Sequence, residues 1–204
     1  VDHSDAATVA PATAQETTPR AIDLRSDAGT TTIVIVDARV SNYASLITDL
    51  PNNVTVRVVQ ANESGLAAVS QALQGRTGVE SVQIISHGTP GSFALGSDVI
   101  NAATLDAQSQ ALQGWSGALT ANADILLYGC DIAKSEPGQA FISQLAHLTG
   151  ADIAASTNPT GSADKGGDWV LESSTGAIEA GLALNEAAMA GYGELLAAPT
   201  VTDA

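Results

Sequence analysis

Residues 81–88 read SVQIISHG, and residues 124–131 read DILLYGCD. Each segment contains an apolar run typical of a strand buried in a sheet, followed by a residue able to take part in catalysis, His87 or Cys130. In an open α/β sheet, ligands and substrates lie at the carboxyl ends of the parallel strands. We therefore expect the histidine and the chain's single cysteine to face each other across a cleft.

Strand and helix patterns alternate on both sides of these two segments. We expect strands at 31–37, 54–59, 152–155 and 168–172, a hairpin at 93–100, a loop at 156–167, and helices at 41–50, 65–73, 101–119, 137–148 and 185–196. This order predicts an α/β fold, in which a mostly parallel central sheet is covered by helices on both faces as a three-layer sandwich.

The 204 residues suit one domain of ordinary size. Residues 1–29 are rich in Ala, Thr, Asp and Pro and have no periodic apolar pattern, which predicts a flexible leader or linker. We expect the folded domain over residues 30–197 and a short tail or linker over residues 198–204.

The chain is strongly acidic, with 22 Asp and Glu against 7 Lys and Arg and a formal net charge of -15. This charge excludes nucleic acid as a partner, because phosphate would be repelled. No apolar run approaches the roughly 20 residues of a membrane-spanning helix, so we expect no membrane insertion by this domain. The dispersed acidity and the low aromatic content, 3%, indicate an extracellular or cell-surface protein of a bacterium.

A thiol peptidase needs a nucleophilic cysteine, an imidazole to protonate the leaving group and backbone N–H groups to bind the oxyanion. Gly129 permits a tight turn that would leave Cys130 at the mouth of the sheet. Cys130, His87 and the amides of Gly88 and Cys130 could supply all three functions. Alternatively, the cysteine is a buried apolar residue and the histidine a structural one.

The order of these motifs carries a resemblance. A strand ending in His87-Gly88, followed by another ending in Gly129-Cys130, resembles the caspase-like cysteine peptidases, which include caspases, legumain, gingipains, clostripain and separase. Residues 31–175 also resemble an uncharacterised domain found near the N-termini of very large bacterial surface adhesins. The resemblance implies a caspase-like sheet with Cys130 as nucleophile, His87 as the acid, and the Gly88 and Cys130 amides as the oxyanion hole.

The resemblance also implies that the end of the first strand helps to form the primary specificity pocket. Asp37 stands there, and its carboxylate would favour a substrate with Arg or Lys at the P1 position. Alternatively, Asp37 caps the following helix or pairs with Arg39. Ser156 and Thr157 follow a later strand on the same rim, so they bind the substrate backbone or belong to an inert connector.

The environment of the thiol has two opposing features. Asp131 would raise the pKa of Cys130 by repulsion, whereas a helix beginning near residue 131 would lower it. We expect no cofactor and no essential metal, because His3 lies in the leader and His147 on a separate helix. Surface carboxylates leave calcium possible, although no loop has EF-hand spacing.

These features predict a cysteine endopeptidase domain of a large bacterial surface protein. Its substrate would be a polypeptide, either its own chain or a neighbouring one, with Arg20 and Arg25 of the leader as candidate cleavage residues. The competing hypothesis is a catalytically silent module that binds a partner or retains the N-terminal end of an adhesin in its secretion apparatus.

Overall fold

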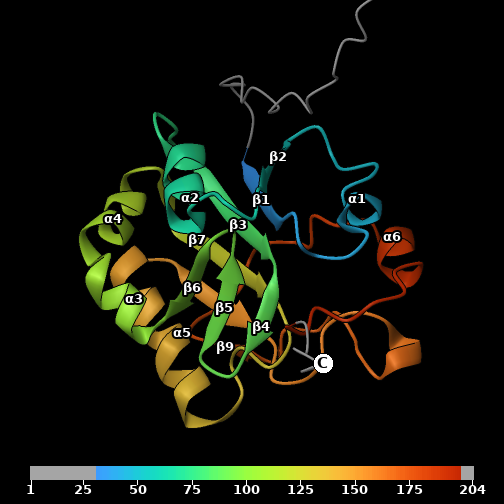
Figure 1. Ribbon diagram of the computed structural model, residues 1–204. Coiled ribbons are helices and arrows are strands. Elements are labelled where there is room, and N and C mark those ends of the chain that lie inside the picture. Colours follow the sequence, from blue (N-terminus) through green and yellow to red (C-terminus); the bar gives the residue numbers. More distant parts are fainter. Residues whose placement is uncertain (1–30, 199–204) are drawn as a thin grey trace, which may run out of the picture.

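The central sheet of the molecule has six strands in the order β2-β1-β3-β7-β8-β9. The computed structural model describes residues 31–198 (Figure 1). All neighbouring strands are parallel except β8 and β9, which are antiparallel. The strands are β1 (Thr32–Asp37), β2 (Val54–Val59), β3 (Val79–Ile85), β7 (Leu119–Tyr128), β8 (Asp152–Ala155) and β9 (Ser173–Ser174).

The β-branched run of β1 explains how the sheet is buried. Ile33 and Ile35 belong to one apolar cluster, and Val34 and Val36 belong to a second cluster on the opposite face. Successive side chains of a strand point to opposite faces, so both faces of β1 are covered. Continuous apolar runs of this kind are typical of parallel sheets enclosed between layers of helices.

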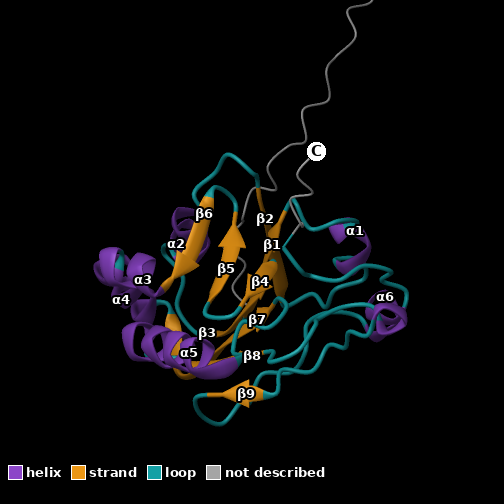
Figure 2. Ribbon diagram, turned by 60° about the horizontal axis from the view of Figure 1, so that its bottom comes forward, coloured by secondary structure: helices purple, strands orange, loops and turns teal. Residues whose placement is uncertain are grey.

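Helices flank the sheet on both sides, as the sequence predicted. Figure 2 shows α2 (Gly65–Leu73), α3 (Ala102–Ala107), α4 (Ser109–Gly114) and α5 (Ser135–Thr149) on one side, and α1 (Tyr43–Leu46) and α6 (Glu186–Ala190) on the other. Short 3-10 turns occupy Trp115–Gly117 and Ala163–Lys165. The predicted α/β class and the mostly parallel sheet in three layers are therefore confirmed at this level.

A second, smaller sheet follows β3 directly. It consists of the antiparallel strands β4 (His87–Thr89), β5 (Ser92–Leu95) and β6 (Asp98–Asn101). The predicted hairpin at 93–100 is confirmed by the pairing of β5 with β6. His87 begins β4, and the turn that follows is confined to Pro90 and Gly91.

The strand predicted at 168–172 is wrong. The Asp168 carboxylate accepts hydrogen bonds from the Val170 N–H (2.8 Å) and the Asn158 side-chain amide (2.9 Å). These local contacts take the place of the backbone hydrogen bonds that a strand would make with a neighbouring strand. Trp169 packs against Tyr128 and Tyr192. The aromatic residue is therefore part of the core without being part of a strand.

Three predicted helices are shorter or broken. The helix expected at 185–196 ends at Ala190, because Gly191 and Gly193 follow, and residues 194–197 leave the helix. The helix expected at 41–50 is a single turn, and the one at 101–119 is divided at Gln108, whose ψ of 17° is not helical. Tertiary contacts, more than the helical spacing of their apolar residues, determine the conformation of these segments.

Between residues 31 and 198, no helix is both long and apolar enough to cross a membrane. The predicted leader, with Arg20 and Arg25, lies outside the described residues, as does all of the predicted tail except Ala198.

Candidate functional site

The carboxyl ends of β3 and β7 lie side by side. Ile85 pairs with Tyr128, so His87 and Cys130 each stand two residues beyond a paired position. The approach is close, because a Cβ atom added to Gly88 would lie 2.5 Å from the Cys130 carbonyl oxygen. Only glycine fits at this position, and it allows the two predicted functional segments to meet.

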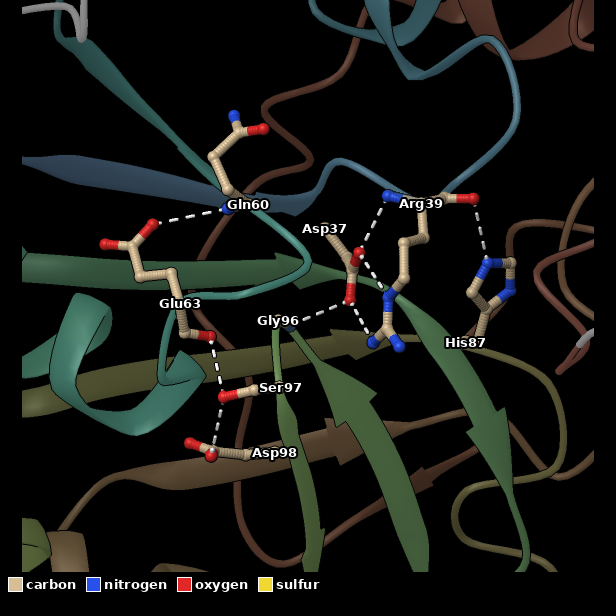
Figure 3. A network of polar contacts seen from close by, with 8 residues as sticks. All are labelled: Asp37, Arg39, Gln60, Glu63, His87, Gly96, Ser97 and Asp98. Atoms are coloured by element: carbon tan, nitrogen blue, oxygen red, sulfur yellow. Dashed lines mark hydrogen bonds and ion pairs between the residues drawn. The ribbon is translucent and has the colours of Figure 1, made fainter.

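The His87 ring has one nitrogen held and one nitrogen free. Nε2 lies 3.2 Å from the Arg39 carbonyl oxygen (Figure 3). A carbonyl only accepts hydrogen bonds, so Nε2 carries the proton in the neutral ring. Nδ1 is buried and has no partner among the described residues. Cys130 Sγ is therefore not hydrogen-bonded to the imidazole, and it contacts the Thr160 backbone instead.

Asp37 supports this histidine through the backbone. Its wholly buried carboxylate accepts hydrogen bonds from the Arg39 N–H (2.8 Å), the Arg39 guanidinium (2.7 and 3.1 Å) and the Gly96 N–H (2.9 Å). The side-chain hydrogen bond to Asp37 raises the pKa of the Arg39 guanidinium above its ordinary value. Asp37 therefore pairs with Arg39, which is the alternative that the sequence left open. The pair fixes the peptide whose carbonyl orients His87 (Figure 3).

The Cys130 thiol is enclosed, and its side chain is held by Thr160. The Thr160 N–H donates to Sγ at 3.2 Å, and Sγ donates to the Thr160 carbonyl oxygen at 3.7 Å. The residue is only 3% exposed, and this burial is the main cause of a raised thiol pKa. The backbone of Thr160 lowers the pKa, whereas the charge of Asp131 raises it further. Helix α5 begins at Ser135, so no helix begins at residue 131.

The two amides predicted to bind an oxyanion converge on a single carbonyl oxygen. Leu196 O accepts one hydrogen bond from the Gly88 N–H (3.1 Å) and a second from the Cys130 N–H (3.4 Å). Two backbone donors directed at one carbonyl oxygen are also what an oxyanion hole requires. Here that carbonyl belongs to the chain's own C-terminal segment.

This segment, residues 194–197, is the part of the site that sequence reasoning missed. It pairs with the loop after β8 through the Leu196 N–H to Thr160 O bond (2.8 Å) and the Ser162 N–H to Glu194 O bond (2.8 Å). The apolar spacing of residues 185–196 had predicted a helix there. Gly191 and Gly193 were the available signal that the helix ends earlier.

Ser156 and Thr157 lie in the predicted loop but contact other partners. The buried Ser156 hydroxyl donates to the Asn158 carbonyl oxygen (2.9 Å), and Thr157 donates to the Glu172 carboxylate from its N–H (2.7 Å) and its hydroxyl (3.3 Å). Within the described residues, the same loop meets the C-terminal segment through positions 160–162. A backbone-binding role at 156 and 157 stays a prediction.

A group of carboxylates lies toward the opposite end of the sheet. Asp124, Asp152 and Glu179 each offer an oxygen within 4.8 Å of the others, so the group could bind a metal. Asp124 is buried, and its Oδ2 accepts hydrogen bonds from the Glu179 N–H (2.9 Å) and the Ala180 N–H (2.7 Å). Asp124 precedes Cys130 by six residues, which places the group roughly 20 Å from the thiol at strand spacing.

Comparison with known proteins adds one match. Residues 33–196 match the model of a family described as a domain of unknown function, DUF4347. No curated protein and no solved structure matches the chain. The match covers the whole sheet and both strand ends that carry His87 and Cys130, and the chain therefore belongs to the DUF4347 family.

Proposed function

We propose that this domain is a cysteine endopeptidase in which Cys130 is the nucleophile and His87 the general base and acid. One observation carries the proposal: the Gly88 and Cys130 amides both bind the Leu196 carbonyl oxygen. Preorganised donors of this kind stabilise the charge that develops on a carbonyl oxygen during thiol attack, and each can contribute about 10²–10³ in rate.

The residues suit each step of peptide hydrolysis. His87 Nδ1 takes the thiol proton, while the Nε2–H to Arg39 carbonyl bond stabilises the resulting imidazolium. The thiolate attacks the substrate carbonyl carbon, and the Gly88 and Cys130 amides hold the oxyanion. The C–N bond then breaks as His87 returns the proton to the leaving amine. Water, activated by the same nitrogen, hydrolyses the thioester and restores the thiol.

The setting of this activity follows from the sequence. The His-Gly and Gly-Cys order resembles that of caspase-like peptidases, and the acidic composition supports a position on or outside a bacterial cell. The substrate is a polypeptide of the same surface adhesin or of a neighbouring chain. No step requires a cofactor, and the carboxylate group at Asp124 takes no part in the chemistry.

The test compares four proteins in one cleavage assay. Wild type, Cys130→Ala, His87→Ala and the control His147→Ala are incubated with a mixed peptide library and followed by mass spectrometry. His147 is exposed on α5, away from the strand ends, so its loss should leave cleavage intact. We expect cleavage by wild type and His147→Ala, none by Cys130→Ala, and a reduction of at least 100-fold in His87→Ala.

Two results would overturn the proposal. Equal cleavage by wild type and Cys130→Ala would assign the activity to another residue or to a contaminant. No cleavage of the library or of the chain itself by any of the four proteins would favour the catalytically silent binding or retention module.

A further inference from the structure

We propose that the peptide bond between Leu196 and Ala197 is the bond that Cys130 cleaves in its own chain, and that the site accepts leucine at P1. This inference rests on the proposed peptidase function and adds the bond and the substrate class. It begins with the carbonyl of Leu196, which already occupies the two-amide site formed by Gly88 and Cys130.

The C-terminal segment is bound as an extended peptide substrate would be. On one side it pairs antiparallel with residues 160–162, with a bridge between Gly161 and Leu195. On the other side, Ala197 forms a parallel bridge with Gly88. Addition of an extended strand to exposed backbone is a common mode of peptide recognition, because main-chain hydrogen bonds fix the register. Here they fix the Leu196 carbonyl oxygen at the Gly88 and Cys130 amides.

Glycine at position 161 makes this approach possible. Its φ is +129°, a conformation that other residues rarely adopt, and an added Cβ would lie 2.3 Å from the Glu194 carbonyl oxygen. The Lys165 ammonium also forms an ion pair with the Glu194 carboxylate. The loop after β8 is therefore shaped to accept residues 194–196.

The Leu196 side chain is part of the apolar core. It is fully buried in the cluster that includes Val36, Val40, Tyr128 and Tyr192. Surroundings of this composition favour an aliphatic side chain over a charged one, because burial of an unpaired ammonium or guanidinium is costly.

A basic P1 preference was predicted from Asp37. Both oxygens of its carboxylate, however, already accept hydrogen bonds within the protein. Its carboxylate binds the Arg39 side chain and two backbone N–H groups. A lysine or arginine of a substrate would have to displace Arg39. We therefore assign leucine to P1 in place of a basic residue.

The proposed step needs no reactant other than water. The thiolate of Cys130 forms a bond to the carbonyl carbon of Leu196, and the bond from that carbon to the nitrogen of Ala197 breaks. His87 supplies the proton that makes the Ala197 amine. Hydrolysis of the thioester leaves a free carboxylate on Leu196 and regenerates the thiol.

The experiment follows the intact mass of the 204-residue chain over time, and the mass of each fragment locates the cut. Cys130→Ala is the inactive reference. Leu196→Asp places a charge in the apolar core, and Leu182→Asp is its control, because Leu182 is 38% exposed and lies outside the segment. Ala197→Pro makes the leaving nitrogen a tertiary amide, at an exposed position whose N–H donates no backbone hydrogen bond among the described residues. Circular dichroism checks the fold of each variant.

The expected result is loss of residues 197–204 from wild type and Leu182→Asp, with cleavage reduced at least 100-fold in Leu196→Asp and Ala197→Pro and absent in Cys130→Ala. Cleavage that depends on Cys130 but falls at another bond, or that continues unchanged in folded Leu196→Asp and Ala197→Pro, would overturn this inference and leave the peptidase function standing. Library cleavage that depends on Cys130, with no cut in the chain, would do the same. Loss of both activities would overturn the function itself.

Discussion

At the scale of single residues, the orientation of His87 depends on a group outside the proposed dyad. The Arg39 carbonyl holds Nε2, and the Arg39 N–H and side chain are held in turn by Asp37 (Figure 3). In the proposed mechanism Asp37 is a positioning residue, since its effect on the imidazole passes through the Arg39 backbone. The hydrogen-bond partners of metal-bound histidines change activity by about 10–100-fold when they are removed, and we expect the same range here.

Replacement of Asp37 by alanine should lower kcat about 10–100-fold with little change in KM, because the imidazole loses its orientation while the pocket stays apolar. The free energy of unfolding should fall by about 1–3 kcal/mol, because the buried Gly96 N–H loses its acceptor. Peptide cleavage kinetics and urea unfolding measure the two effects. Asp164→Ala, at an exposed position, is the control and should change neither.

A rise in KM with kcat unchanged would argue instead that Asp37 contacts the substrate. That outcome would restore the basic P1 preference and remove the positioning role.

The raised pKa of Cys130 makes stability depend on pH in a defined direction. The unfolded thiol loses its proton near a pKa of roughly 8.5, whereas the folded protein retains it to higher pH. The stabilisation contributed by the buried thiol is therefore complete below the unfolded pKa, and is lost as the pH rises toward the folded pKa.

Urea unfolding under reducing conditions can isolate this contribution as the difference between wild type and Cys130→Ala. We expect the wild-type advantage to be smaller at pH of about 9.5 than at neutral pH. Each unit of pKa shift corresponds to about 1.4 kcal/mol at most. A difference that grows with pH would mean that the folded thiol ionises more readily than the unfolded one, contrary to the enclosed site described above.

At the scale of elements, the loop after β8 contacts both the thiol, through Thr160, and the C-terminal segment at 194–197. Gly161 lies against the C-terminal segment, whereas Gly166 also has a positive φ, +80°, but has open space around its Cα. Substitution at Gly166 tests backbone strain alone, whereas substitution at Gly161 also tests displacement of the C-terminal segment.

Gly161→Ala should displace residues 194–197 and increase the rate of Cys130 alkylation by iodoacetamide in the folded protein. Gly166→Ala should carry only backbone strain, at a cost of about 1 kcal/mol, and leave the alkylation rate unchanged. Mass spectrometry of the alkylated protein over time gives both rates. Equal rates in the two variants would show that the segment does not close the site.

The same elements show which parts could be predicted from sequence. The runs ending before His87 and Cys130 predicted two adjacent strands, and their apolar residues fixed the faces of the sheet. The segment at 194–197 could not be predicted, because its conformation comes from hydrogen bonds to Thr160 and Ser162, more than 30 residues away in sequence. Its apolar spacing instead resembled a helix.

At the scale of the whole molecule, two apolar clusters lie on opposite faces of one sheet. Val34 is fully buried in one cluster and Val82 in the other, whereas Val99 is 58% exposed. Val34→Ala and Val82→Ala should each reduce the free energy of unfolding by about 1.5–3 kcal/mol, and Val99→Ala by no more than about 0.5 kcal/mol. Urea unfolding checks the three values. A negligible cost for Val34→Ala or Val82→Ala would mean that one face is open.

The layered architecture was predictable because the central strands β1, β3 and β7 carry apolar residues on both faces of the sheet. The proximity of the segments that carry His87, Gly88 and Cys130 was predictable, and the catalytic roles of these residues stay predictions. Asp37 was placed correctly at the end of the first strand, but its partner was undecided, since pairing with Arg39 depends on the turn that brings their side chains together.

The most direct test of the central claim is covalent labelling of Cys130 in the folded protein. The probe is a peptide ending in Glu-Leu-Leu that carries an acyloxymethyl ketone in place of the scissile bond, and peptide mapping locates the adduct. A reactive nucleophile beside an oxyanion hole predicts one adduct, on Cys130, which His87→Ala slows by at least 100-fold and His147→Ala leaves unchanged. Labelling that occurs only after the protein is unfolded in urea would identify Cys130 as a buried structural thiol and contradict the account.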